Sequence, residues 1–318
     1  MNVSATAWAV TLVAVFGVYI VEFILAARRP HVVGPREAGL WVGVYVAAAI
    51  AFGGLVAAIW GSDYALQYYA GWLTEYSLSV DNLFVFALIL STFAVPRLYQ
   101  QKVLLIGITF ALVLRFIFIL VGAAALDRFD WLFLVFGAFL LYTAAKLLTG
   151  HGTEEDPSQN VILRRIRRVL PVSPEYDEGR FTTRHAGRLM ATPLLMVVIA
   201  LFVIDLVFAL DSIPAIFGLT TEPYIVFTAN AFALMGLRQL YFLLDNLLDR
   251  LVYLDKGLAV ILAFIGVKLI LHALHEIGWN VPEIGIVASL VVILSILLIT
   301  VVLSLRSSGG RVTDQRDV

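Results

Sequence analysis

Cysteine is absent from the 318 residues of the chain, which excludes disulfides, thiolate metal ligands and thiol redox chemistry. Charge is also scarce: Asp, Glu, Lys and Arg make up 14% of the residues, whereas 61% are hydrophobic. A soluble domain carries roughly 25% charged residues, so this composition argues against a soluble globular protein. The short segments of alternating polarity that a membrane β-barrel requires are missing. No glycine-rich phosphate-binding loop is present, which makes an ATPase improbable.

Long apolar runs dominate the chain, and many reach the roughly 20 residues that a membrane-spanning helix needs. The chain is therefore predicted to be an all-α, polytopic membrane protein with about nine transmembrane helices. The spans are expected near residues 5–27, 39–60, 68–94, 103–126, 131–149, 191–217, 224–245, 257–274 and 284–305.

Basic residues are distributed unequally between the loops on the two sides of these spans. The loops on one side contain seventeen Lys or Arg residues, whereas those on the other contain Arg128 alone. The positive-inside rule makes the basic loops cytoplasmic, so we predict the N-terminus outside and the C-terminus in the cytoplasm. The longest cytoplasmic loop, 150–190, turns from acidic to basic. It is either a regulatory or lipid-head-group patch or, as we prefer, an amphipathic orientation signal.

An acidic motif occurs twice inside the predicted spans. Each copy has an acid, five residues, an aspartate and a small polar residue: Glu75, Asp81 and Asn82 in the first, and Asp205, Asp211 and Ser212 in the second. An ionised carboxylate at the centre of a bilayer helix costs roughly 2.5–3.5 kcal/mol, so such residues are usually functional. Two matching copies indicate a duplicated site.

The likeness between the two halves extends beyond the acids. Arg115 and Arg238 occupy the fourth and seventh spans, and Lys146 and Lys268 occupy the fifth and eighth. Because each unit has three spans, the second must enter the membrane from the opposite side, which predicts an inverted repeat with a site at the midplane. The chain then divides into peripheral helices at 1–67, a first repeat at 68–149, a cytoplasmic loop at 150–190, a second repeat at 191–274, and a last helix with a cytoplasmic tail at 275–318.

The basic side chains in the repeats must largely pair with the acids or reach water, because isolated charges are costly in the membrane. Arg115 and Arg238 are interpreted as counter-ions of the empty acidic site, with purely structural ion pairs as the alternative. Lys268 is assigned the same charge-compensating role. Lys146 is placed in that set too, although its position near a helix end favours a side chain that extends to the interface.

The acidic motif provides only oxygen ligands. Oxygen suits hard divalent cations such as Mn²⁺, Mg²⁺ and Ca²⁺, whereas copper and zinc more often take sulfur or imidazole. Buried carboxylates near like charges can also exchange protons, so a proton relay is the competing role. A proton-coupled antiporter would need the same acids to bind both the metal and protons.

Other polar side chains in the predicted spans are weaker candidates. Glu22 is either an auxiliary metal ligand or, as we prefer, an acid that pairs with a single partner, and Asn230 is a candidate cavity residue. We interpret His272 as a histidine exposed to water at the membrane interface in preference to a metal ligand.

A spacing of six residues places Glu75 and Asp81 about 240° apart around an ideal helix, so the two acids do not share a face. Pro214 closely follows Asp211, and two serines separate the first pair. Unwound segments at membrane depth can provide backbone carbonyl ligands. We therefore predict that both motif helices are broken.

The stretch from Glu75 to Phe84 and the stretch from Asp205 to Ala215 resemble the TerC family of integral membrane proteins, and most closely its Alx-like subgroup. The likeness runs from the second span to the ninth. It implies a bacterial inner-membrane protein that exports Mn²⁺, with the six motif residues as the metal site. The transported ion is then the only metal, with no prosthetic group.

Other functions remain open. A membrane scaffold could act in metal, tellurite or alkaline stress through loop 150–190. An intramembrane aspartyl enzyme is disfavoured because the Gly-x-Gly-Asp type of motif is missing, so we expect no enzyme activity. The expected partners are Mn²⁺, protons and the lipid bilayer, with no nucleic acid.

Overall fold

The computed structural model describes residues 1–28, 33–129, 131–149, 172–173, 176–177, 179–185, 188–244 and 253–311. Within these residues the chain is almost wholly helical, so the predicted all-α fold is confirmed. The helices are α1 (Ala5–Arg28), α2 (Pro35–Trp60), α3 (Ser62–Thr92), α4 (Arg97–Leu126), α5 (Leu132–Leu148), α7 (Pro193–Phe217), α8 (Pro223–Met235), α9 (Leu237–Leu244), α10 (Leu254–Glu276) and α11 (Ile286–Arg311).

The described part of the chain contains eight segments long and apolar enough to cross a membrane, in addition to the shorter apolar helix α5. In one of the eight, α8 and α9 together form a single span. Helices are the expected solution because each backbone N–H and C=O inside the hydrocarbon must find a partner within the segment. The polytopic membrane architecture predicted from hydropathy is therefore confirmed.

Proline and glycine set several helix ends. Pro35, Pro193 and Pro223 begin α2, α7 and α8, where the missing proline N–H costs no intrahelical hydrogen bond. Gly61 alone connects α2 to α3. Its φ angle is 104°, a backbone conformation that residues with a Cβ rarely adopt. The chain can therefore reverse between these two spans within one residue.

The prediction that the two motif helices are broken is wrong. Helix α3 is continuous through Glu75 and Asp81, and α7 is continuous through Asp205 and Asp211. Pro214 does not interrupt α7 because only the Leu210 carbonyl loses its intrahelical hydrogen bond and the helix ends shortly afterwards at Phe217. The interruption occurs instead at Gly236, which separates α8 from α9 two residues before Arg238.

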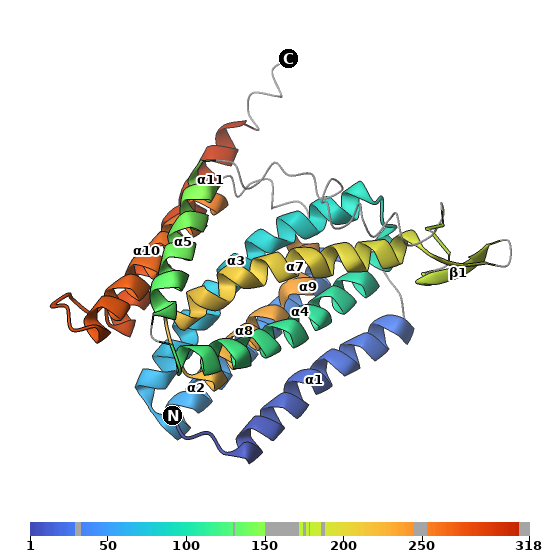
Figure 1. Ribbon diagram of the computed structural model, residues 1–318. Helices are drawn as coiled ribbons and strands as arrows, with labels where there is room; N and C mark the ends of the chain where they lie inside the picture. Colours follow the sequence, from blue (N-terminus) through green and yellow to red (C-terminus); the bar gives the residue numbers. More distant parts are fainter. Residues whose placement is uncertain are drawn as a thin grey trace.

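The helices of the two acidic segments form the centre of the molecule. Helix α3 packs against α7 and α8, and α4 packs against α7 and α8. Figure 1 shows α5, α10 and α11 side by side at one edge, and α1 at another edge beside α4. Helices α5 and α10 approach so closely at Gly137 that an added Cβ would lie 2.8 Å from the carbonyl oxygen of Gly266. Most of the buried apolar side chains form one cluster shared by these helices.

A small β-hairpin precedes α7, formed by antiparallel strands β1 (Thr182–His185) and β2 (Arg188–Ala191), and the sequence patterns did not predict it. It projects from one end of the bundle (Figure 1). The segment before it is attached to the α3–α4 end: the Tyr176 hydroxyl donates to the Phe93 carbonyl at 2.6 Å, and Lys102 Nζ donates to the Gly179 carbonyl at 2.8 Å. The predicted amphipathic segment of loop 150–190 falls largely on residues outside the described part.

Candidate cation site

A buried ion-pair network joins α3, α4 and α7 at the centre of the bundle. The Arg115 guanidinium contacts Glu75 Oε1 through Nη1, and its Nη2 donates to Asp205 Oδ1 at 3.3 Å. The side chains of Arg115 and Glu75 are 0% exposed, and that of Asp205 is 4% exposed. The close packing of α4 on α7, and of α3 on α7, brings these charges together.

The network contains two carboxylates and one guanidinium, so it carries one excess negative charge when both acids are ionised. A buried charge without a partner costs several kcal/mol, so an additional cation or proton would stabilise the arrangement. Within the described residues, Glu75 Oε2, Asp205 Oδ2 and Arg115 Nε have no hydrogen-bond partner. Carboxylate oxygens of this kind are suitable ligands for a hard divalent cation.

A serine one helical turn after Glu75 completes the visible contacts of that acid. The Ser79 hydroxyl is fully buried and donates to Glu75 Oε1 at 3.1 Å. Residues four apart on a helix are neighbours, so this spacing could have identified Ser79 as part of the site. From the sequence, Ser79 was one of the two serines between Glu75 and Asp81 that suggested a helix break, and it was not predicted to contact Glu75.

The remaining motif residues continue along the same two helices. Asn82 is 5% exposed and Ser212 is 2% exposed, and the Ser212 hydroxyl has no partner among the described residues. The side chains of Asp81 and Asp211 lie outside what the structure describes. Among the residues that remain, no three acidic or histidine side chains gather closely enough to hold a metal ion.

Asn230 is a further polar side chain inside the bundle. It lies on α8, which packs against both α3 and α4, and it is 0% exposed. Neither its amide nitrogen nor its amide oxygen has a hydrogen-bond partner in the described part of the chain. Buried amides normally have partners, so Asn230 indicates a place for water or an ion beside the helices of the network.

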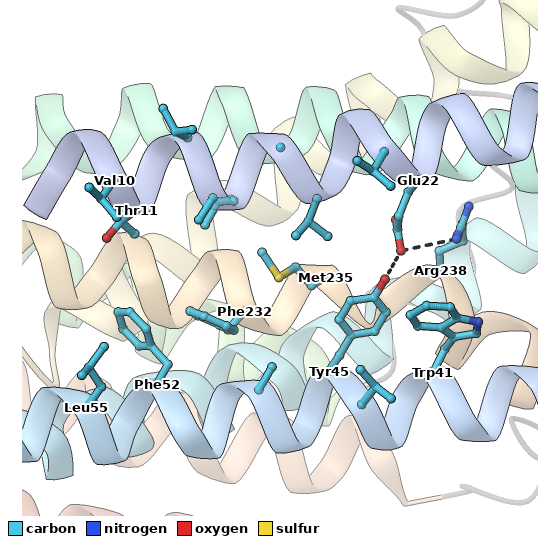
Figure 2. A pocket seen from close by; sticks show the side chains of 18 of the residues that line it. Val10, Thr11, Glu22, Trp41, Tyr45, Phe52, Leu55, Phe232, Met235 and Arg238 are labelled. Carbon is cyan, nitrogen blue, oxygen red and sulfur yellow. Dashed lines mark hydrogen bonds and ion pairs between the residues drawn. The ribbon is translucent and has the colours of Figure 1, made fainter.

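Arg238 takes part in a second ion pair, separate from the motif acids. Its Nη2 lies 3.4 Å from Glu22 Oε1 on α1, and the Tyr45 hydroxyl of α2 donates to the same oxygen. Figure 2 shows these three side chains meeting between α1 and α2. The interpretation of Glu22 as a satisfied acid agrees with this geometry. Tyr45 was missed because a single tyrosine within the predicted span 39–60 has no distinctive spacing.

The two lysines lie elsewhere. Lys146 is exposed in the last turn of α5, and Lys268 Nζ donates to the Ser289 hydroxyl of α11 at 3.1 Å. His272 Nδ1 lies 3.5 Å from Glu283 Oε1, and both side chains are substantially exposed. In the described structure, therefore, Arg115 is the basic side chain in contact with motif acids.

Comparisons with known proteins point to a family of integral membrane proteins. A family model described as "Integral membrane protein TerC family" matches residues 60–310. An "Uncharacterized membrane protein" of Mycobacterium tuberculosis is 48% identical over 98% of this chain and 82% of its own length. "Putative membrane-bound redox modulator Alx" of Escherichia coli is 38% identical over 89% of each chain. "Thylakoid membrane protein TERC, chloroplastic" of Arabidopsis thaliana is 47% identical over 72% of this chain and 60% of its own. No solved structure matches the chain.

Proposed function

Because the chain belongs to the TerC family of integral membrane proteins, we propose that it is a secondary transporter that exports divalent metal cations, chiefly Mn²⁺, from the cytoplasm. The observation that carries the proposal is the buried Glu75–Arg115–Asp205 network, in which one oxygen of each carboxylate has no hydrogen-bond partner among the described residues. An oxygen-only site without cysteine or histidine suits Mn²⁺ better than copper or zinc. Asp81, Asn82, Asp211 and Ser212 complete the proposed ligand set.

Arg115 has a defined role in this proposal, as the cation that occupies the empty site. Its guanidinium lies where two carboxylates converge, so an entering metal ion would compete with it for the same oxygens. Binding would release Arg115, and departure of the metal would let it return. Because either Arg115 or the metal ion is always beside the carboxylates, the buried acids are without a cation only briefly. Protons that replace the metal on the same acids would couple export to inward proton movement.

The helix contacts support an inverted repeat of α3–α5 and α7–α10. A two-fold axis that exchanges the two units would map the α3–α8 contact onto the α4–α7 contact. Both contacts are present, and the third helices of the units, α5 and α10, pack against each other. Such repeats place the substrate site at the midplane between the halves. From the unequal loop charges we further propose that the transporter lies in the bacterial inner membrane with its N-terminus outside.

The proposal is tested by measuring cellular manganese in a bacterial host that depends on this chain for Mn²⁺ tolerance. Asp81→Asn and Asp211→Asn should each raise manganese content and sensitivity, because an amide is a weaker ligand than a carboxylate for a hard cation. Membrane insertion of each variant is confirmed by immunoblotting of membrane fractions. Wild-type manganese content in both inserted variants would reject the acids as a transport site.

A membrane scaffold that acts through loop 150–190 is the second candidate, and the β-hairpin of this loop, which projects from one end of the bundle, favours it. A scaffold would depend on this hairpin and not on the motif acids. Deletion of residues 182–191 should then abolish stress tolerance, whereas Asp81→Asn should leave it unchanged. A thiol-based redox role is excluded because the chain has no cysteine.

A further inference from the structure

A long groove lies between α1 and α2, with side chains of α8 and α9 at its base. Its volume is about 1320 Å³, and its lining extends along α2 from Glu37 to Trp60. Those residues span about 35 Å at 1.5 Å per residue, which is close to the thickness of the hydrocarbon core. Figure 2 shows the groove bounded by the two helices, with Phe232 and Met235 between them. The groove therefore extends across the membrane and not only over one interface.

The walls of the groove are apolar and face outward. Val10 and Val13 of α1 are 63% and 74% exposed, and Leu55 and Ile59 of α2 are 50% and 57% exposed. Inside a bilayer, such surfaces contact either lipid tails or another helix. Acyl chains are as apolar as these side chains, so they can fill the groove without a dedicated protein partner.

One end of the groove differs from the rest because charged side chains line it: Glu22, Glu37 and Arg238. Arg238 and Gln239 line it and are 8% and 4% exposed. Arg238 Nε and Gln239 Oε1 have no hydrogen-bond partner in the described part of the chain, although the Arg238 guanidinium pairs with Glu22. A wholly apolar occupant would leave these two buried polar atoms without a partner, which is unfavourable.

The same end of the groove opens toward the start of α2. Gly34 provides no side-chain cap for this helix, and Arg36 is exposed in its first turn. The N-terminus of a helix and an adjacent arginine together favour a phosphate group. Because Glu37 of the same turn lines the groove, this mouth carries charges of both signs and complements a zwitterionic phospholipid head group.

We propose that the groove is a binding site for a diacyl phospholipid from the leaflet at the N-terminal end of α2. The acyl chains lie along the apolar walls, an ester carbonyl accepts the Arg238 Nε–H, and the phosphate lies near Arg36. In the orientation proposed above, this leaflet is the cytoplasmic one. The bound lipid fills the space between α1 and the helix that carries Arg238. This site is independent of the proposed cation transport.

Two glycines provide a matched pair of variants. An added Cβ would meet nothing within 4 Å at Gly17, which lines the groove at mid-height, or at Gly43, which is on α2 but is not among the lining residues. Gly17→Phe should therefore fill the groove without disturbing the packed core. Gly43→Phe adds the same side chain outside the groove and controls for general effects on α2.

The experiment is native mass spectrometry of the full chain purified in detergent and exposed to vesicles of phosphatidylethanolamine and phosphatidylglycerol. Wild type and Gly43→Phe should each retain a phospholipid adduct, and Gly17→Phe should retain about tenfold less, as expected for a loss of roughly 1.4 kcal/mol. Arg36→Gln should weaken retention in the same direction. Equal retention by Gly17→Phe and Gly43→Phe would overturn the proposal.

The rival occupant is a second copy of the chain. Because the natural sequence has no cysteine, Val13→Cys introduces a single thiol on the groove wall. Oxidation in membranes should leave this variant monomeric if lipid covers the groove. A disulfide-linked dimer in high yield would show that a second copy occupies the groove and would reject the lipid site.

Discussion

Replacing Arg115 with methionine is expected to destabilise the folded protein by about 3–5 kcal/mol, the usual cost of removing one partner from a buried ion pair. The substitution leaves Glu75 and Asp205 facing each other in the centre of the bundle without a cation. The expected result is a marked fall in the midpoint of thermal unfolding in detergent, measured by size-exclusion chromatography after heating. The yield of inserted protein should fall as well.

A compensated variant provides the control. Combining Arg115→Met with Glu75→Gln and Asp205→Asn removes all three charges and keeps similar side-chain volumes. Replacement of a complete buried ion-pair network by neutral groups is often tolerated. The midpoint should therefore recover substantially, while transport should not. If Arg115→Met alone were as stable as wild type, the network could not be the buried ion pair described above.

Neutralising Glu75 is expected to weaken Mn²⁺ binding by about 10- to 100-fold, because a contact with a charged group contributes roughly 1.5–3 kcal/mol. Glu75→Gln keeps the size of the side chain and one oxygen for the Ser79 hydroxyl. Affinity is measured by titrating the purified protein with Mn²⁺ and following the electron paramagnetic resonance signal of the free ion.

The matched control is Glu22→Gln, which neutralises another buried carboxylate that pairs with a different arginine. The Mn²⁺ affinity of this variant should remain within about twofold of wild type if binding is confined to the motif acids. Equal losses in the two variants would indicate a general effect of membrane charge. An unchanged affinity in Glu75→Gln would exclude Glu75 as a ligand.

Hydropathy was sufficient to predict the architecture, because the thickness of the bilayer fixes the length of each apolar helix. The boundaries of α5 and α10, for example, agree with the predicted spans within a few residues. The cost of burying charge likewise identified Glu75, Arg115 and Asp205 as residues requiring partners, and the structure places them in contact.

What sequence reasoning missed depends on tertiary packing. Arg115 and Arg238 occupy similar places in the two halves, yet only the packing of α1 gives Arg238 its partner Glu22. The six-residue spacing of the acids suggested broken helices, but an unbroken α3 still buries Glu75 because several helices surround it. The groove between α1 and α2 was also not predictable, since the apolar pattern of each helix does not reveal the space between them.

The most direct test of the proposed function is Mn²⁺ flux in liposomes containing purified wild-type protein or the Asp81→Asn/Asp211→Asn double variant, with a Mn²⁺-sensitive dye inside. The cation-site account predicts saturable Mn²⁺ entry with wild type that is faster than in protein-free liposomes, and entry at the protein-free rate with the double variant. Equal flux through wild type and the double variant, with both folded and inserted, would contradict the account.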